Sequence, residues 1–149
     1  MKRLRNTTPI PAWLVKEVEQ FVMPPGGVGA YDLELRNTDG LWGGRAYMNG
    51  SAYHTTNRRF VVVRVGSWRS PNIEQHGNGY LPMPAMANRL EILVFILAHE
   101  LRHLWQRRVP KSRRVWGARG QFSERDADAW ALHCLRRWRR EVLTNWAWA

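Results

Sequence analysis

The chain has 149 residues, 44% of them hydrophobic, and a formal net charge of +11, which suits one basic domain (residues 1–149) with one apolar core. No apolar run approaches the roughly 18 to 20 residues of a membrane-spanning helix, so we expect no membrane segment. The one cysteine, Cys134, excludes a disulfide within the chain, and we expect it to be a buried apolar residue of a cytoplasmic protein.

The first half of the chain predicts one helix and three strands. Apolar residues recur at helical spacing over residues 10–22, between two proline-containing breakers, and indicate an amphipathic helix. Residues 31–35 alternate apolar and acidic side chains, as in a half-buried strand, and residues 42–48 can form a second strand. Residues 60–65 are β-branched and apolar on both faces, so we expect them to form the central and most buried strand.

A long loop and a buried helix are predicted next. Residues 66–87 are rich in Gly, Pro, Asn and Ser without a clear period, and predict a loop with room for a short edge strand near Tyr80. Asn88 and Glu91 form a capping pair for the helix that follows. This helix is apolar nearly all round in its first half, so we expect it to run through the core and to end before Pro110.

A second helix is predicted at the C-terminal end, where Ser123 and Asp126 form another capping pair. Its buried side is expected to be a stripe of apolar residues at helical spacing, namely Ala127, Ala131, Cys134, Trp138 and Val142. Its solvent side is expected to carry a basic strip, which consists of Arg136, Arg137, Arg139 and Arg140.

The most informative motif lies on the first of these two helices, where residues 99–103 read His-Glu-Leu-Arg-His. His99 and His103 are four residues apart and share one face of a helix, so both imidazoles can reach one metal ion. Glu100 projects close by without being a ligand, which is where a zinc-activated water needs its general base. The motif therefore predicts a metal site with hydrolytic chemistry.

Two acidic residues on the C-terminal helix complete the pattern. Glu124 and Asp128 are also four apart, and Glu124 would add a third ligand to the two histidines. A His/His/Glu set leaves a fourth position open, as in catalytic sites for Zn²⁺, and Asp128 would orient a ligand imidazole through its free N–H. Asp126 lies off that face and is expected to be an ordinary acid in a first helical turn. His133 is the rival third ligand, although it is rotated away from Glu124.

These residues resemble the pattern of the gluzincin metallopeptidases, HExxH followed by a downstream Glu-x-x-x-Asp. The run from Glu124 to Asp128, with Trp130 and Ala131 after it, looks most like small single-domain zincins of the ImmA/IrrE type. The resemblance covers residues 88–135. It implies an α+β fold with an N-terminal helix, a small three- to four-stranded sheet, the HExxH helix and a C-terminal helix that carries the third ligand.

Two other families share the HExxH motif. The SprT/Spartan proteases of DNA–protein crosslinks have it in a compact basic domain, but their third ligand is a histidine, and residues 116–122 contain none. Peptide deformylases combine it with a cysteine ligand upstream, whereas Cys134 lies downstream. Both resemblances therefore fit less well.

The resemblance implies a zinc metallopeptidase that hydrolyses peptide bonds in a protein or peptide substrate. Glu100 would take a proton from the attacking water and return it to the leaving amine. The substrate would lie extended along an edge strand next to the metal helix. A Tyr or His that stabilises the oxyanion is not identified, since no spacing selects His54, His76 or Tyr80 for this role.

The charge indicates a second class of function. Residues 107–140 hold eleven Lys and Arg against three acidic residues, and such a field attracts nucleic acid. The alternative is therefore a nucleic-acid-associated protein on a zincin scaffold that acts through the basic strip, either as a protease recruited by DNA or as a non-catalytic binder. The excess of arginine over lysine, 20 to 3, can equally come from a GC-rich genome.

Overall fold

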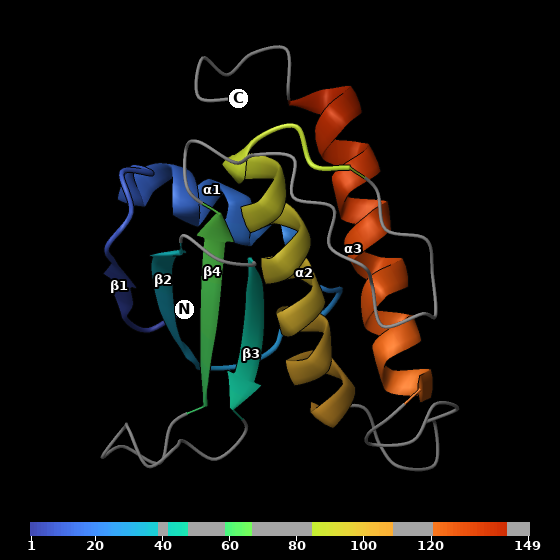
Figure 1. Ribbon diagram of the computed structural model, residues 1–149. Coiled ribbons are helices and arrows are strands. Elements are labelled where there is room, and N and C mark those ends of the chain that lie inside the picture. Colours follow the sequence, from blue (N-terminus) through green and yellow to red (C-terminus); the bar gives the residue numbers. More distant parts are fainter. Residues whose placement is uncertain (39–41, 48–58, 67–84, 109–120, 143–149) are drawn as a thin grey trace.

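The computed structural model describes residues 1–38, 42–47, 59–66, 85–108 and 121–142. Within them the fold is α+β, as predicted, with three helices and a four-stranded mixed sheet (Figure 1). The elements in chain order are β1 (Leu4–Asn6), α1 (Ala12–Val22), β2 (Asp32–Thr38), β3 (Gly43–Tyr47), β4 (Phe60–Gly66), α2 (Arg89–Arg108) and α3 (Gln121–Glu141). None of the described helices has the length and apolar character to cross a membrane.

The sheet has the strand order β1-β2-β4-β3. β1, β2 and β4 run parallel, and β3 pairs antiparallel with β4 at one edge. All residues of β4 except Arg64 are buried, which confirms the prediction of a central buried strand. The sequence does not predict β1, because three residues after a basic start show no alternation. Backbone pairing with β2 makes this segment a strand.

The prediction of a half-buried strand is wrong for the first part of β2. Its alternating acidic residues, Asp32 and Glu34, are buried together with the apolar residues between them. Glu34 is covered because Nη2 of Arg36 lies 2.8 Å and Nε of Arg5 3.8 Å from its Oε1. Long arginine side chains can lie across a sheet and bury a carboxylate while their own charge stays in water.

α2 forms the centre of the core. It lies between the sheet and α3 (Figure 1), and it contacts β3 and β4 on one side and both other helices elsewhere. Every residue from 90 to 98 is buried, as the all-round apolar composition predicts. The predicted cap is also present: the backbone N–H of Glu91 donates to Asn88 Oδ1 at 3.0 Å. The Glu91 carboxylate accepts from the backbone N–H of Ala87 at 2.7 Å.

The predicted start of α3 is wrong. The helix begins at Gln121, so Ser123 lies inside it and does not cap it. The Ser123 hydroxyl donates instead to Gln106 Oε1 on α2, at 2.7 Å, and Asp126 accepts from Arg102 on the same helix. Both polar side chains found partners on α2, which lies far from them in sequence and is therefore invisible to a local capping pattern.

The apolar stripe of α3 is confirmed. Its first four members are buried, Cys134 among them, and Val142 packs on the core just past the end of the helix. The stripe fills the groove beside α2, which is why α3 runs along that helix for its whole length.

The prediction that the basic strip faces solvent is wrong for two of its four members. Arg136 and Arg140 are exposed. Arg137 is partly buried, and its guanidinium carbon lies 4.5 Å from the centre of the Phe21 ring on α1. Arg139 reaches back to α2, where its Nε and Nη2 each lie 2.8 Å from a carboxylate oxygen of buried Glu91. The strip is therefore interrupted by an ion pair that ties the end of α3 to the start of α2.

Candidate metal centre

The two histidines of the motif lie side by side on α2. Their Nε2 atoms are 3.1 Å apart, and the ring planes meet at 81°. The four-residue spacing places them on consecutive turns of the same face, as the sequence predicts. Both are more than half buried beside α3, so a third group that meets them must come from that helix.

Glu124 of α3 is that group. One of its carboxylate oxygens lies 3.1 Å from Nε2 of His99, and the other lies 3.0 Å from Nε2 of His103. The three candidate ligand atoms all lie within 4.8 Å of one another. Two imidazole nitrogens and a carboxylate oxygen form a donor set that suits a borderline cation such as Zn²⁺.

The electrostatics of this cluster favour a positive charge at its centre. Burial alone would lower the pKa of His99, but hydrogen bonds to Asp128 and Glu124 outweigh it and raise that pKa to about 10. The hydrogen bonds from His103 and His99 lower the pKa of the Glu124 carboxyl. A cation among these groups is thus stabilised, whether it is a proton or a metal ion, and the residues present fit a divalent metal.

The remaining ring nitrogens of both histidines are held by acceptors. Nδ1 of His99 lies 2.8 Å from Oδ1 of buried Asp128, and Nδ1 of His103 lies 3.0 Å from Oε1 of Gln106. An acceptor at Nδ1 keeps a proton there, so in each ring Nε2 is the nitrogen that would give up its proton to bind a metal ion beside Glu124. Asp128 lies beside His99, as its four-residue spacing from Glu124 on the same helix face predicted. Gln106 was missed, although it lies three residues after His103 and hence on the same helix face.

Gln106 is itself fixed by α3. Its Nε2 donates to the backbone carbonyl of Ser123 at 2.9 Å and to Oδ2 of Asp126 at 3.0 Å. Because two acceptors face its NH₂ group, the amide oxygen must point toward His103. Ser123 adds a second contact to that imidazole, with its Oγ 3.3 Å from Nδ1.

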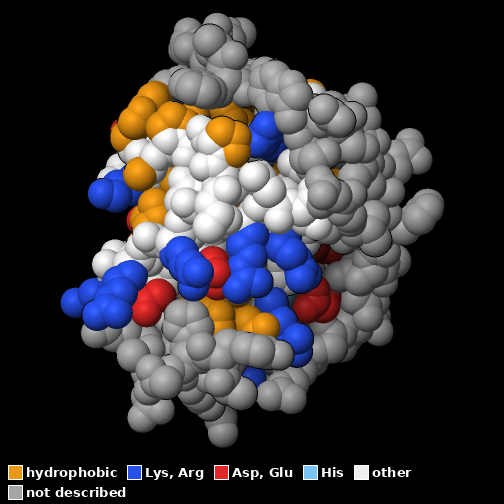
Figure 2. Space-filling model, turned by 60° about the vertical axis from the view of Figure 1, so that its left-hand side comes forward, with side chains coloured by type: hydrophobic (Ala, Val, Ile, Leu, Met, Phe, Trp, Pro, Cys, Tyr) orange, Lys and Arg blue, Asp and Glu red, His pale blue; other side chains and the backbone are white. Residues whose placement is uncertain are grey.

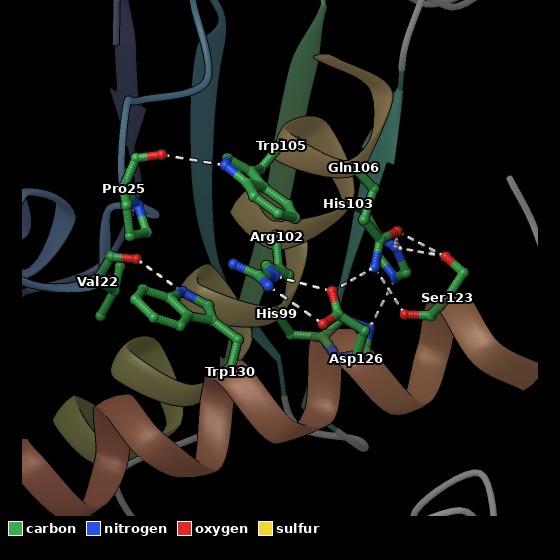
Figure 3. Close-up of polar contacts among 10 residues, drawn as sticks. All are labelled: Val22, Pro25, His99, Arg102, His103, Trp105, Gln106, Ser123, Asp126 and Trp130. Atoms are coloured by element: carbon green, nitrogen blue, oxygen red, sulfur yellow. Dashed lines mark hydrogen bonds and ion pairs between the residues drawn. The ribbon is translucent and has the colours of Figure 1, made fainter. Parts of the chain in front are cut away.

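Arg102 joins the two helices next to this network (Figure 3). Its Nε and Nη2 donate to the two carboxylate oxygens of Asp126 at 2.8 and 3.2 Å. Its guanidinium carbon lies 3.7 Å from the ring centre of Trp105 and 5.3 Å from that of Trp130. The expectation of an ordinary acid at position 126 is therefore wrong, because Asp126 bridges α3 to α2. This contact joins α3 to α2 close to the position of Glu124.

Glu100 lies on the sheet side of the cluster. It is 6% exposed, and burial raises the pKa of its carboxyl above the usual value although His99 and His103 act against the shift. A backbone hydrogen bond from Ala46 reaches its carboxylate from β3. The lack of a side chain at Gly44 leaves room for Glu100, because a Cβ at position 44 would lie 2.9 Å from Glu100 Cγ.

His133, the rival third ligand, does not join the cluster. His133 is exposed on α3 and lies beside the Trp130 ring, so Glu124 and not His133 meets the two histidines. His54, His76 and Tyr80 lie outside the described residues, as does the predicted edge strand at Tyr80.

Comparisons of the chain with protein-family models, curated proteins and solved structures give no match. The functional argument therefore depends on the cluster itself. His99, His103 and Glu124 could hold a metal ion and would leave room in its coordination for water or substrate, and the buried Glu100 carboxylate lies on the same helix as the two histidines. With a metal bound, these groups would have the chemistry for hydrolysis of a carbonyl compound.

Proposed function

We propose that the protein is a zinc-dependent metallopeptidase of the minimal zincin type, similar to the ImmA/IrrE group of gluzincins. His99, His103 and Glu124 would hold the metal. The observation that carries the proposal is the meeting of their three ligand atoms within 4.8 Å, from two helices, in the donor set of a catalytic zinc site. We place the enzyme in the cytoplasm, where its one cysteine stays reduced.

Zn²⁺ in such a site supplies Lewis acidity, which polarises a carbonyl group and makes water acidic enough to lose a proton near neutral pH. Glu100 accepts that proton and passes it to the amine that leaves. Burial, which raises the pKa of this carboxyl, strengthens it as a base for the proton of the water. Asp128 and Gln106 keep the imidazoles oriented while the charge at the site changes.

The substrate class follows from the edge of the sheet. β3 is an edge strand of the described sheet, it contacts α2, and its Ala46 backbone already faces Glu100. A peptide that pairs with this edge would lie extended beside the base, with its carbonyl groups in reach of the metal. We therefore expect a protein or peptide substrate in extended conformation.

The proposal is tested by Glu100→Gln. The amide cannot accept a proton, so hydrolysis of fluorescein-labelled casein should fall by about 100-fold or more, while zinc content stays at the wild-type level. Glu17→Gln on the exposed side of α1 makes the same chemical change away from the cluster and should leave both readouts unchanged. Casein hydrolysis at the wild-type rate in Glu100→Gln would contradict the proposed mechanism.

The alternative function, a nucleic-acid-associated protein that acts through the basic strip, has less support on α3. Of the four arginines of the basic strip, only Arg136 and Arg140 are exposed, and Arg139 is engaged with Glu91. Exposed arginines are common on the surfaces of helices and indicate no partner by themselves.

A further inference from the structure

The sheet face turned away from α2 carries a basic hollow of about 420 Å³. Figure 2 shows Lys and Arg side chains gathered in a band across one side of the molecule, with acidic side chains among them. The hollow is lined by residues from all four strands, namely Arg5, Glu34, Arg36, Arg45, Tyr47, Phe60, Val62 and Arg64. The metal cluster lies among the helices, so the two sites are separate.

Each strand contributes one arginine to this face: Arg5 from β1, Arg36 from β2, Arg64 from β4 and Arg45 from β3. All four are exposed. Arg36 and Arg64 are direct register partners in neighbouring strands. Like charges in neighbouring positions repel each other, and a bound anion would reduce that repulsion.

Among the described residues, one carboxylate, that of Glu34, meets the arginines of this face. Oε1 of Glu34 lies 2.8 Å from Nη2 of Arg36, with which it forms an ion pair, and 3.8 Å from Nε of Arg5. Among the residues that the structure describes, no carboxylate pairs with Arg45 or Arg64. These two guanidinium groups lie on the half of the hollow formed by β4 and β3, and their donors can meet an external anion.

An aromatic pair lies in the same half. The Tyr47 and Phe60 rings stack at 4.3 Å with an angle of 9° between their planes. Phe60 is 3% exposed, whereas Tyr47 is only partly buried. The Arg45 guanidinium carbon lies 5.3 Å from the Tyr47 ring centre. A partly exposed ring with a guanidinium group over it, in the lining of a basic hollow on a sheet, offers groups on which an unpaired base can stack.

We propose that this face binds single-stranded nucleic acid, with phosphates on the arginines and a base on Tyr47. The arginines extend across three interstrand steps, about 14 Å in total, which is more than one phosphate group spans and suits a run of several nucleotides. A duplex hides its bases, and a peptide of Asp and Glu has no aromatic ring to stack. The aromatic pair therefore favours a single strand over both. The site is independent of the proposed peptidase activity.

The test is fluorescence anisotropy with a labelled 12-nucleotide oligothymidylate. Four phosphate contacts give a salt slope of about −2.8, so wild-type affinity should fall about 50-fold between 50 and 200 mM salt. In the double variant Arg45→Gln/Arg64→Gln, the loss of affinity over the same salt range should be only about 7-fold, because two phosphate contacts are removed. The matched control is Arg136→Gln/Arg140→Gln, which makes the same charge change on α3 and should behave as wild type.

Tyr47→Leu separates stacking from charge. This variant should lose about fivefold or more in affinity with an unchanged salt slope. Thermal unfolding of each variant verifies that it is folded. The proposal is overturned if the oligonucleotide does not bind, if the α3 variant weakens binding as much as the sheet variant, or if Tyr47→Leu binds as wild type. It is also overturned if a 12-residue oligoglutamate or a duplex competes as well as the single strand.

Discussion

Gly44→Ala should impair catalysis without removing the metal. A Cβ at this position of β3 would lie 2.5 Å from Cγ2 of Ile96 and 2.9 Å from Cγ of Glu100. Carbon atoms in ordinary contact are about 3.5 to 4.0 Å apart, so a neighbour must move by about 1 Å. Neither atom is the free end of a flexible chain, because Ile96 is β-branched in a helix and Glu100 Cγ is close to the backbone.

The magnitude follows from these contacts. Overpacking of this kind costs about 1 to 3 kcal/mol of unfolding free energy. If Glu100 is the general base, as we propose, a shift of about 1 Å in its position lowers the rate on the order of 100-fold. The zinc content should not change, since the atoms nearest to the added Cβ belong to Ile96 and Glu100 and to none of the three candidate ligands.

The assay combines casein hydrolysis, urea unfolding and zinc content. Gly43→Ala is the matched control on the same strand. Its Cβ would lie 3.8 Å from Nη2 of Arg64, which is an ordinary van der Waals contact. For this control we expect casein hydrolysis at the wild-type rate and a free energy of unfolding within about 0.5 kcal/mol of the wild-type value. Equal rates for Gly44→Ala and Gly43→Ala would refute the idea that β3 positions Glu100.

Three further predictions concern the helices and the metal. Arg139→Gln should lower the free energy of unfolding by about 3 kcal/mol in urea, because it leaves Glu91 buried without its cation, whereas Arg140→Gln should change it by less than about 0.5 kcal/mol. Equal effects of the two changes would show that the ion pair is not structural. Asp128→Ala should weaken zinc affinity by about 10- to 100-fold in a competition titration, since His99 loses its acceptor; an unchanged affinity would remove Asp128 from the site. Free zinc at 100 times its dissociation constant should stabilise the wild type by about 2.7 kcal/mol, and a thermal transition insensitive to zinc and chelator would argue against a site formed only in the folded chain.

Local patterns predicted the three helices and three of the strands: helical or alternating spacing for α1, α3 and β2, and continuous apolar runs for α2 and β4. β3 was predicted only from its place between two turn signals. Local spacing also brought His99, His103, Glu124 and Asp128 together, since residues four apart on a helix share a face and the two helices need only pack against each other.

The missed features depend on partners far away in sequence. Arg139 finds Glu91 at a separation of 48 residues, and Arg102 finds Asp126 at a separation of 24. No local pattern distinguishes such an arginine from one that faces solvent. For the same reason the sequence did not indicate that Glu34 is buried on the open face of the sheet, where its cover comes partly from a neighbouring strand.

The measurement that bears most directly on the metal centre is the zinc content of purified protein beside two single variants. We expect about one zinc per chain in the wild type, a large loss in Glu124→Ala, and full content in His133→Ala, because Glu124 and not His133 lies against both Nε2 atoms. Full zinc content in Glu124→Ala, or its loss in His133→Ala, would contradict the ligand set.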